Sequence, residues 1–256
     1  MSFHLALITG ATGGLGAALC QVLHEQGIPL LLTGRDAEKL AKLGNQYSAQ
    51  TIPCDIRSRA PLLDVIRERT PDLVINNAGF ALYGDATSHP TKDQLDIFEV
   101  NGGAVLDITL EAARALQREQ KSGVILNISS AAAPFSFPGL AVYAAAKAFI
   151  SALSLSLDAE LRPHGICVLT ALPGQIATPF ASRAAARPLP RHPQAIDPTK
   201  AAQLLWKQIL SRKPLQIIDW RYRLALRFAR LLPRGLVERH LAQEIQGRLL
   251  YPINNQ

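Results

Sequence analysis

The stretch TGATGGLG, Thr9–Gly16, decides the fold, because it joins an apolar strand candidate to an amphipathic helix candidate. Its glycines permit a tight turn that approaches a pyrophosphate closely, and a helix N-terminus offers that anion unpaired N–H groups and a favourable dipole. A purely structural turn is the alternative for a lone glycine-rich loop. The position of this one, after the first strand of a βαβ unit, favours dinucleotide binding.

Outward from this turn, short apolar runs alternate with longer amphipathic segments. Strands that are apolar throughout are typical of a parallel sheet covered by helices on both faces. The βαβα order therefore predicts an α/β protein with a single-domain, doubly wound parallel sheet of the Rossmann-like type. The expected strands are His4–Thr9, Leu30–Thr33, Gln50–Cys54, Leu73–Asn76, Val124–Ser129 and Cys167–Leu172.

The chain is long enough to bury one core, so we expect residues 1–256 to form one dinucleotide-binding catalytic domain. The longest helix is predicted at Ala141–Arg162, and another near Asp197–Leu210. Between them, residues 175–200 are rich in proline and follow a strand's carboxyl end, where a substrate lid would lie. A basic amphipathic extension is expected at residues 220–256.

The cysteines indicate a reducing compartment. Cys20, Cys54 and Cys167 are odd in number, lie far apart in apolar segments and lack the spacing of zinc or disulfide sites. We expect buried core thiols and no metal site. Met1–Leu7 lacks the features of a signal peptide, and no uninterrupted apolar run approaches the roughly 18 residues of a spanning helix. The expected location is the cytoplasm.

Several further motifs accompany the glycine-rich turn. They are Cys54-Asp55-Ile56, Asn76-Asn77-Ala78-Gly79, Asn101 in VNGG, Ser130 thirteen residues before Tyr143, Lys147 four residues after it, and Pro173-Gly174 with Thr178. Together with TGATGGLG, which resembles the pattern TGxxxGxG, they resemble the short-chain dehydrogenase/reductase family over residues 5–180. This resemblance implies an oxidoreductase that interconverts a carbonyl and an alcohol by hydride transfer from a nicotinamide cofactor.

The resemblance also implies the residues that contact the cofactor. Asp55 would meet the adenine, and the backbone at Pro173 and Gly174 would meet the nicotinamide amide. Asn101 would hold the water that relays protons from Lys147. The predicted cofactor contacts are Gly10, Thr12, Gly14, Leu15, Gly16, Arg35, Asp55, Asn77, Ala78, Gly79, Tyr143, Lys147, Pro173, Gly174 and Thr178. Taken alone, Asp55 is equally a turn residue, and the NNAG asparagines could simply fasten the sheet.

The second strand ends in Thr33-Gly34-Arg35-Asp36, which indicates the cofactor type. No carboxylate stands where NAD-selective enzymes hold the ribose hydroxyls. The planar fork of Arg35 suits a 2′-phosphate, which a carboxylate would repel. We therefore expect NADP(H). The alternative is that Arg35 is a solvated surface residue and that Asp36 caps the next helix.

Tyr143 and Lys147 lie one turn apart on one helix face, so their side chains can act together. A phenol is a poor base at neutral pH, but an adjacent ammonium favours the phenolate. Ser130, with Ser129 as the competing candidate, would donate a hydrogen bond to the substrate oxygen. Taken singly, Ser130 is equally a cap, Tyr143 a half-buried aromatic and Lys147 a solvated charge. Together they match the Ser and YxxxK triad of the family.

Other function classes stay open. An epimerase or dehydratase relative would share the fold and the YxxxK pair, and a non-catalytic regulatory protein can share the fold. Such regulatory relatives usually lose the Tyr or the Lys, whereas this chain has both. We expect a small carbonyl or alcohol substrate, with an apolar pocket near Phe135, Phe137, Leu140 and Phe180, although core packing explains these residues equally. The resemblance implies a homodimer or homotetramer.

The formal net charge is +7, and residues 220–256 carry seven arginines against two glutamates. Arg223, Arg227, Arg230 and Arg234 recur at helical spacing, with leucines and Phe228 on another face and Pro233 dividing the segment into two helices. The apolar side can cover the substrate site or a partner subunit, or it can attach to an anionic membrane surface. We expect no nucleic-acid binding, because no base-reading module accompanies the charge.

Overall fold

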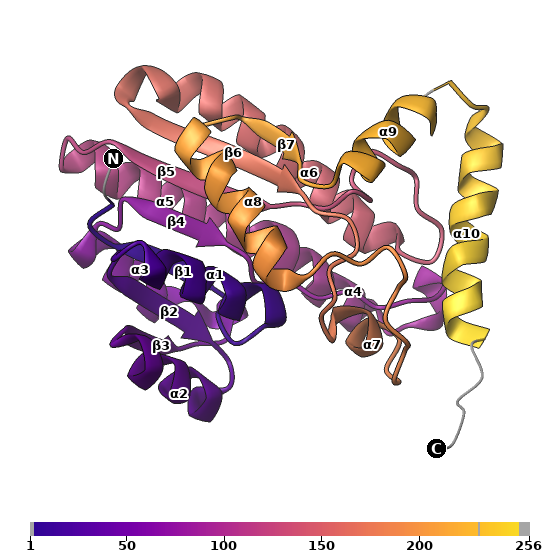
Figure 1. Ribbon diagram of the computed structural model, residues 1–256, viewed down its shortest axis with the longest axis horizontal. Helices are drawn as coiled ribbons and strands as arrows, with labels where there is room; N and C mark the ends of the chain where they lie inside the picture. Colours follow the sequence, from indigo (N-terminus) through magenta and orange to yellow (C-terminus); the bar gives the residue numbers. More distant parts are fainter. Residues whose placement is uncertain (1–2, 230, 251–256) are drawn as a thin grey trace.

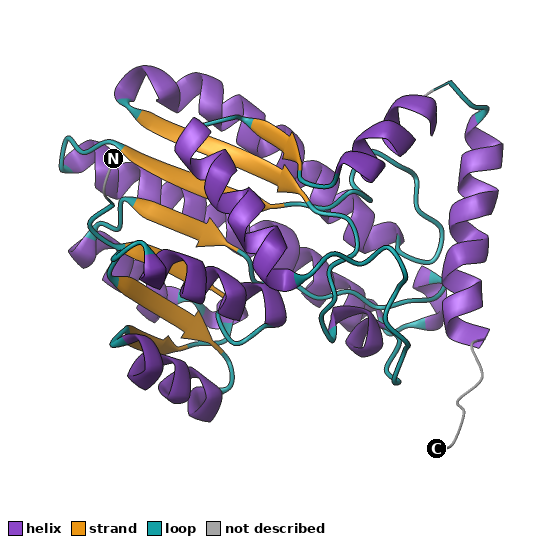
Figure 2. Cartoon of the chain, viewed as in Figure 1, coloured by secondary structure: helices purple, strands orange, loops and turns teal. Residues whose placement is uncertain are grey.

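The computed structural model describes residues 3–229 and 231–250 and contains one parallel sheet of seven strands (Figures 1 and 2). The strand order is β3-β2-β1-β4-β5-β6-β7, so the order reverses between β1 and β4. The predicted doubly wound α/β sheet is confirmed. The strands are β1 Ala6–Thr9, β2 Leu30–Gly34, β3 Gln50–Pro53, β4 Leu73–Asn76, β5 Gly123–Ile128, β6 Ile166–Leu172 and β7 Leu215–Ile217.

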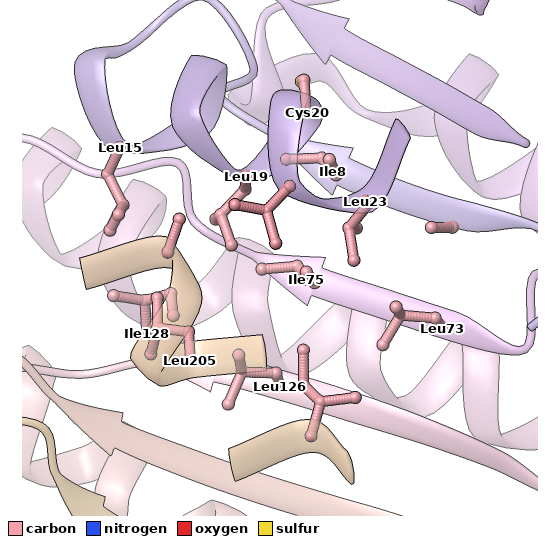
Figure 3. Packing of buried hydrophobic residues seen from close by; sticks show 14 of the residues in the cluster. Ile8, Leu15, Leu19, Cys20, Leu23, Leu73, Ile75, Leu126, Ile128 and Leu205 are labelled. Carbon is pink, nitrogen blue, oxygen red and sulfur yellow. The ribbon is translucent and has the colours of Figure 1, made fainter. Parts of the chain in front are cut away.

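The central strands are apolar throughout because successive side chains enter opposite cores. On β1, Ile8 packs into the cluster that also contains Leu19 and Leu205, whereas Leu7 packs into the cluster that contains Ile66. The register aligns equivalent positions, so that Ile8 lies beside Ile75. Figure 3 shows this first cluster between the sheet and its covering helices.

Helices cover both faces of the sheet (Figure 1). The first cluster takes residues from α1, α2 and α8, and the second from α3, α5 and α6. The α-helices are α1 Gly14–Glu25, α2 Ala37–Tyr47, α3 Ala60–Arg69, α4 Thr91–Phe98, α5 Ala104–Arg118, α6 Ala141–Leu161, α7 Phe180–Ala184, α8 Pro198–Ser211, α9 Trp220–Ala229 and α10 Arg234–Leu250.

The element boundaries follow local chemistry. Asp36 caps α2 by accepting a hydrogen bond from the Lys39 N–H, and Asp197 caps α8 in the same way. Pro233 separates α9 from α10, as the sequence predicts, while Arg230 and residues 251–256 lie outside the described residues. The prediction omits β7 and α7 and begins β1 two residues too early, at His4. It also extends β3 and β5 one residue too far, to Cys54 and Ser129.

Helix α6 is a core element. Within residues 3–229 and 231–250, the segment Ala141–His164 alone is long and apolar enough to span a membrane by length and composition. Its buried Asp158 instead accepts a hydrogen bond from the Val168 N–H of β6, 2.9 Å away. Ser129, also buried, contacts the Lys147 carbonyl oxygen at 2.7 Å and the Ser151 hydroxyl at 2.8 Å. These bonds fix α6, and the side chains it carries, against the sheet.

Candidate active site

A cleft of about 1310 Å³ opens at the carboxyl ends of the strands. It contains the crevice between β1 and β4, where the strand order reverses and where ligands bind to sheets of this kind. Every residue predicted to contact the cofactor lines this cleft, together with Ser130 and Asn101. The fold thus gathers these residues from the whole length between Gly10 and Thr178.

The glycine-rich turn leads directly into the N-terminus of α1, which begins at Gly14. Gly10 has a φ of +64°, a conformation that side chains disfavour, and a Cβ there would lie 2.9 Å from the Ala78 Cα. A Cβ on Gly14 would lie 2.6 Å from the Thr178 methyl group. The turn therefore needs glycine at both positions, because its backbone packs directly against Ala78 and Thr178.

Asparagines of the NNAG segment fasten β1 to β4. The Asn77 side-chain amide donates to the Thr9 carbonyl oxygen at 2.9 Å, while the Thr9 hydroxyl accepts from the Asn77 and Ala78 N–H groups at 3.0 Å each. Asn76 is buried and donates to Thr109 and Asn127. Asn76 thus serves the sheet, whereas Asn77 serves the sheet and also lines the cleft.

The far end of the cleft is basic. The exposed Arg35 follows β2, and Lys39 and Arg57 also line this end. Asp55 is held by Arg57 at 2.6 Å, and this pair, with Arg35 contributing, lowers the pKa of Asp55 to about 2. The sequence prediction missed Arg57, because the residue belongs to no motif, although its contact with Asp55 is made within one turn of the chain.

Tyr143, on the first turn of α6, is half-buried in the cleft. Burial raises the pKa of its phenol to about 12, and a hydrogen bond with the Ser130 hydroxyl partly opposes that rise. The Ser130 oxygen also accepts from the Ala132 N–H at 3.1 Å, which orients it. Ser129 is turned away into its contacts with α6. Of the two candidate serines, Ser130 is therefore the one beside the phenol.

Lys147 is buried beneath Tyr143. Its ammonium donates to the Ile128 carbonyl oxygen at 2.8 Å and lies 5.7 Å from the centre of the Tyr143 ring. Burial lowers the pKa of Lys147 to about 7, and no carboxylate of residues 3–229 or 231–250 forms an ion pair with it. The protonated form of this buried side chain therefore lowers the stability of the folded protein.

Asn101 lies in a π-helical turn, Glu99–Gly103, of the kind often found at functional sites. Its amide donates to the Phe80 and Ile97 carbonyl oxygens at 2.8 and 2.9 Å, so the Asn101 Oδ1 must face away from them. That oxygen is buried and has no partner among the described residues. A Cβ built on Gly79 would meet both the Asn101 Oδ1, at 2.6 Å, and the Lys147 Nζ, at 3.5 Å. The acceptor therefore faces the lysine side of the site.

The lowered pKa of Lys147 predicts how the free energy of unfolding depends on pH. Because the folded pKa is below the unfolded value, the unfolded chain binds more protons between about pH 7 and pH 10.5, and stability rises over that range. Below about pH 7 the burial cost is fully present. Lys147→Met removes it, so we expect the variant to be the more stable at pH 6.5, by up to about 5 kcal/mol, with the difference closing toward pH 10.

Urea unfolding of both proteins at several pH values measures this difference. Lys207→Met, at an exposed position on α8, is the matched control and should show no such trend. A difference between wild type and Lys147→Met that stays constant from pH 6.5 to pH 10 would contradict the lowered pKa.

The other half of the cleft is an apolar chamber. Phe135, Phe137, Leu140 and Phe180 all line it, so the predicted pocket exists at these residues. Helices α9 and α10 complete the wall with Tyr222, Leu226, Val237, Leu241 and Ile245. The Tyr222 ring lies against Gly174, and its hydroxyl accepts from the Gln175 N–H at 3.3 Å.

Helix α10 is held over the chamber by polar contacts. Arg248 donates to the Tyr83 hydroxyl at 3.0 Å and pairs with Glu244 at 2.6 Å, and Arg187 donates to the Arg248 carbonyl oxygen. Ile245 is buried in the same region. The proline-rich segment 175–200 joins this wall, closed at its base by a bridge between Ile176 and Ile196.

The cysteine prediction needs one correction. Cys20 and Cys167 are buried core thiols, and burial raises the pKa of Cys20 to about 12. Cys54 is only half-buried and lines the basic end of the cleft, because β3 ends one residue earlier, at Pro53, and the chain turns there. Among the described residues, no group of three or more His, Cys, Asp or Glu side chains is placed to hold a metal ion.

Comparisons with known proteins agree with this geometry. The short chain dehydrogenase family matches residues 4–188. An uncharacterized oxidoreductase of Staphylococcus aureus strain MW2 is 31% identical over 207 residues, covering 78% of this chain and 87% of the relative.

Two solved structures resemble the fold. A short-chain dehydrogenase from Sphingobium yanoikuyae, in complex with NADPH, gives a TM-score of 0.76 at 26% identity, covering 91% of this chain and 94% of the other. A bulky-bulky ketone specific alcohol dehydrogenase from Comamonas testosteroni gives 0.75 at 24% identity, covering 99% and 96%, a likeness of fold alone. The chain therefore belongs to the short-chain dehydrogenase/reductase family of oxidoreductases.

Proposed function

We propose that this protein is an NADP(H)-dependent oxidoreductase that interconverts an apolar ketone or aldehyde and its alcohol. One observation carries the proposal: the hydroxyls of Ser130 and Tyr143 line the same cleft next to a buried Lys147, between a glycine-lined turn and an apolar chamber. A cofactor bound in the first part of the cleft and a substrate in the second would meet at the two hydroxyls.

The residues of the cleft fit a dinucleotide. The α1 N-terminus would hold the pyrophosphate, the segment from Pro173 to Thr178 the nicotinamide amide, and Lys147 its ribose. The exposed Arg35 would bind a 2′-phosphate. The family member from Sphingobium yanoikuyae was solved with NADPH, which supports the same choice here. When bound, the cofactor supplies or accepts the hydride.

Each side chain has a distinct task. With its pKa near 12, Tyr143 is protonated at neutral pH and is ready to give its phenolic proton to the oxygen of a carbonyl during reduction. Ser130 would donate a hydrogen bond to that oxygen as negative charge develops on it. A charged Lys147, 5.7 Å from the phenol ring, stabilises the phenolate that remains. The buried Asn101 Oδ1 would accept from a water that returns the proton by way of Lys147.

The chamber favours an apolar substrate of some bulk. Aromatic and aliphatic side chains from four separate parts of the chain line it. The charge of Glu244 is compensated by an ion pair with Arg248, 2.6 Å away. An apolar carbonyl compound gains free energy by leaving water for such a surface. The experiment that tests the function is a panel of bulky apolar ketones and aldehydes with NADPH, with loss of NADPH absorbance as the readout.

The rival functions predict other outcomes. A regulatory protein on this fold would bind NADPH without consuming it, and an epimerase or dehydratase would convert its substrate with no net change of the cofactor. The intact Ser130, Tyr143 and Lys147 support the reductase over a regulatory protein. The short chain and the TGxxxGxG form of its glycine-rich turn support it over an epimerase or dehydratase.

We further propose a cytoplasmic homodimer or homotetramer that contacts a membrane surface through residues 220–250 and does not bind nucleic acid. The exposed Leu95 and Phe98 of α4 and Leu155 of α6 support pairing of subunits along these helices. The domain assignment, with residues 175–200 as a substrate lid, remains part of the same proposal.

A further inference from the structure

Helix α9 presents apolar side chains on two opposite faces. Tyr222, Leu226 and Ala229 line the substrate chamber, and Leu226 is buried. Trp220 and Leu224, about half a turn away around the helix, point outward and are 63% and 47% exposed. The inner face explains how α9 closes the chamber, but it leaves the outer face without a partner.

The outer face continues beyond α9 into the turn and the start of α10. Phe228, near the end of α9, is 59% exposed. Beyond the helix, Leu231, Leu232 and Leu236 are 81%, 54% and 55% exposed. We call the set of Trp220, Leu224, Phe228, Leu231, Leu232 and Leu236 the outer patch. Six large apolar side chains open to water within seventeen residues are unusual for a soluble surface and typical of an interaction site.

Arginines border the outer patch. Arg223 and Arg227 are exposed on α9, one turn apart, and neither forms an ion pair or side-chain hydrogen bond with any described residue. Arg221 and Arg234, by contrast, pair with Asp219 and Glu238. The free guanidinium groups give the border of the patch an uncompensated positive charge.

The position of the patch suits a large flat partner. Figure 1 shows α9 and α10 together at one end of the molecule, beyond the carboxyl ends of the strands, where they stand apart from the sheet and its covering helices. Each side chain of the outer patch is at least 47% exposed, so a partner that contacts the patch would lie next to the helix that closes the chamber.

We propose that the outer patch and its arginines dock on the surface of an anionic phospholipid bilayer. Apolar side chains would enter the boundary between headgroups and acyl chains, and Arg223 and Arg227 would meet lipid phosphates. A second copy of the chain is the weaker candidate, because a two-fold interface would set this positively charged patch against itself. The inference rests on the membrane contact proposed above for residues 220–250 and adds the residues and the lipid charge that it requires. It does not depend on the catalytic proposal, since α9 has the same two faces whatever reaction the site performs.

The test is co-sedimentation of the full chain with phosphatidylcholine vesicles that contain or lack phosphatidylserine. We expect binding only to the phosphatidylserine vesicles at low salt, and its loss at high salt. Leu224→Ser with Phe228→Ser, and separately Arg223→Gln with Arg227→Gln, should each lower the partition coefficient by about tenfold or more. The matched controls are Leu210→Ser, which is 50% exposed on α8, and Lys121→Gln with Lys207→Gln, and both should bind as wild type does.

Fluorescence places the contact on the patch. Trp206 and Trp220 are the two tryptophans of the chain, so Trp206→Phe leaves Trp220 as the reporter. Its emission should shift to shorter wavelength when phosphatidylserine vesicles are added. The proposal is overturned if wild type fails to sediment with anionic vesicles at low salt, if it binds both vesicle types equally, or if the patch variants change the oligomeric state and leave vesicle binding intact.

Discussion

Replacement of Tyr143 by Phe should lower kcat for carbonyl reduction by about 100-fold to 10,000-fold, the range that loss of a general acid produces. The change removes one oxygen atom and leaves the ring in place beside Phe180, whose centroid lies 5.9 Å away. The affinity for NADPH should stay nearly unchanged, because the other cleft residues are untouched. Steady-state kinetics with a ketone that the wild-type protein reduces measures kcat. Calorimetric titration measures the affinity for NADPH.

Tyr47→Phe is the matched control. Tyr47 ends α2, packs against His24 with ring centroids 5.1 Å apart and lies outside the cleft, so loss of its hydroxyl should leave kcat unchanged. Retention of more than a few per cent of wild-type activity in Tyr143→Phe would refute the assignment of this phenol as the acid. An equally large loss in Ser130→Ala, with cofactor affinity retained, is compatible with that assignment because both hydroxyls line the same part of the cleft and would act on the same substrate oxygen.

Arg35→Asp should raise the Kd for NADPH on the order of 100-fold and change the Kd for NADH by less than about threefold. The substitution removes the donors that would meet a 2′-phosphate and puts a like charge in their place. NADH lacks that phosphate, so its affinity reports only general damage to the cleft. Titration of the protein with each cofactor measures both constants.

Lys42→Asp serves as the matched control, since Lys42 pairs with Glu38 on the exposed side of α2 and does not line the cleft. If Arg35→Asp weakens NADPH and NADH equally, another cation holds the phosphate. Lys39 and Arg57 are then the residues to change next, because both line the same end.

The fold was largely predictable because the pattern that encodes it is local. Leu7 and Ile8 are both apolar because each packs into a different core. Consecutive apolar residues of this kind indicate a strand that is covered on both faces. The strand β7 was not predicted because it lacks this pattern. It has three residues, all half-buried at the edge of the sheet, so its sequence carries no run of apolar residues to detect.

The cleft was predictable where motifs mark it and not elsewhere. Tyr143 and Lys147 are neighbours on one helix, so their joint placement follows from their spacing. The choice of Ser130 over Ser129 follows from the family spacing, and the contacts of Ser129 with α6 support it. Tyr222 carries no motif, and its contact with Gly174 joins residues nearly fifty positions apart.

The chamber wall formed by α10 depends on long-range packing in the same way. The contact between Arg248 and Tyr83 spans 165 residues, and no local pattern specifies it. The sequence does predict an amphipathic segment here but leaves open which side faces the site. The structure divides the apolar residues of α9 into an inner and an outer set, so covering the chamber does not account for the exposed ones.

The most direct measurement of the central claim follows the hydride itself. The protein is incubated with NADPH that carries deuterium at both C4 positions and with the panel of bulky apolar ketones and aldehydes, and each product alcohol is examined by mass spectrometry. The account predicts one deuterium on the former carbonyl carbon per NADPH consumed, and a rate of transfer in Tyr143→Phe that is lower by about 100-fold to 10,000-fold. If calorimetry shows that NADPH binds but no deuterium reaches any alcohol in the panel, the proposed reductase activity is contradicted.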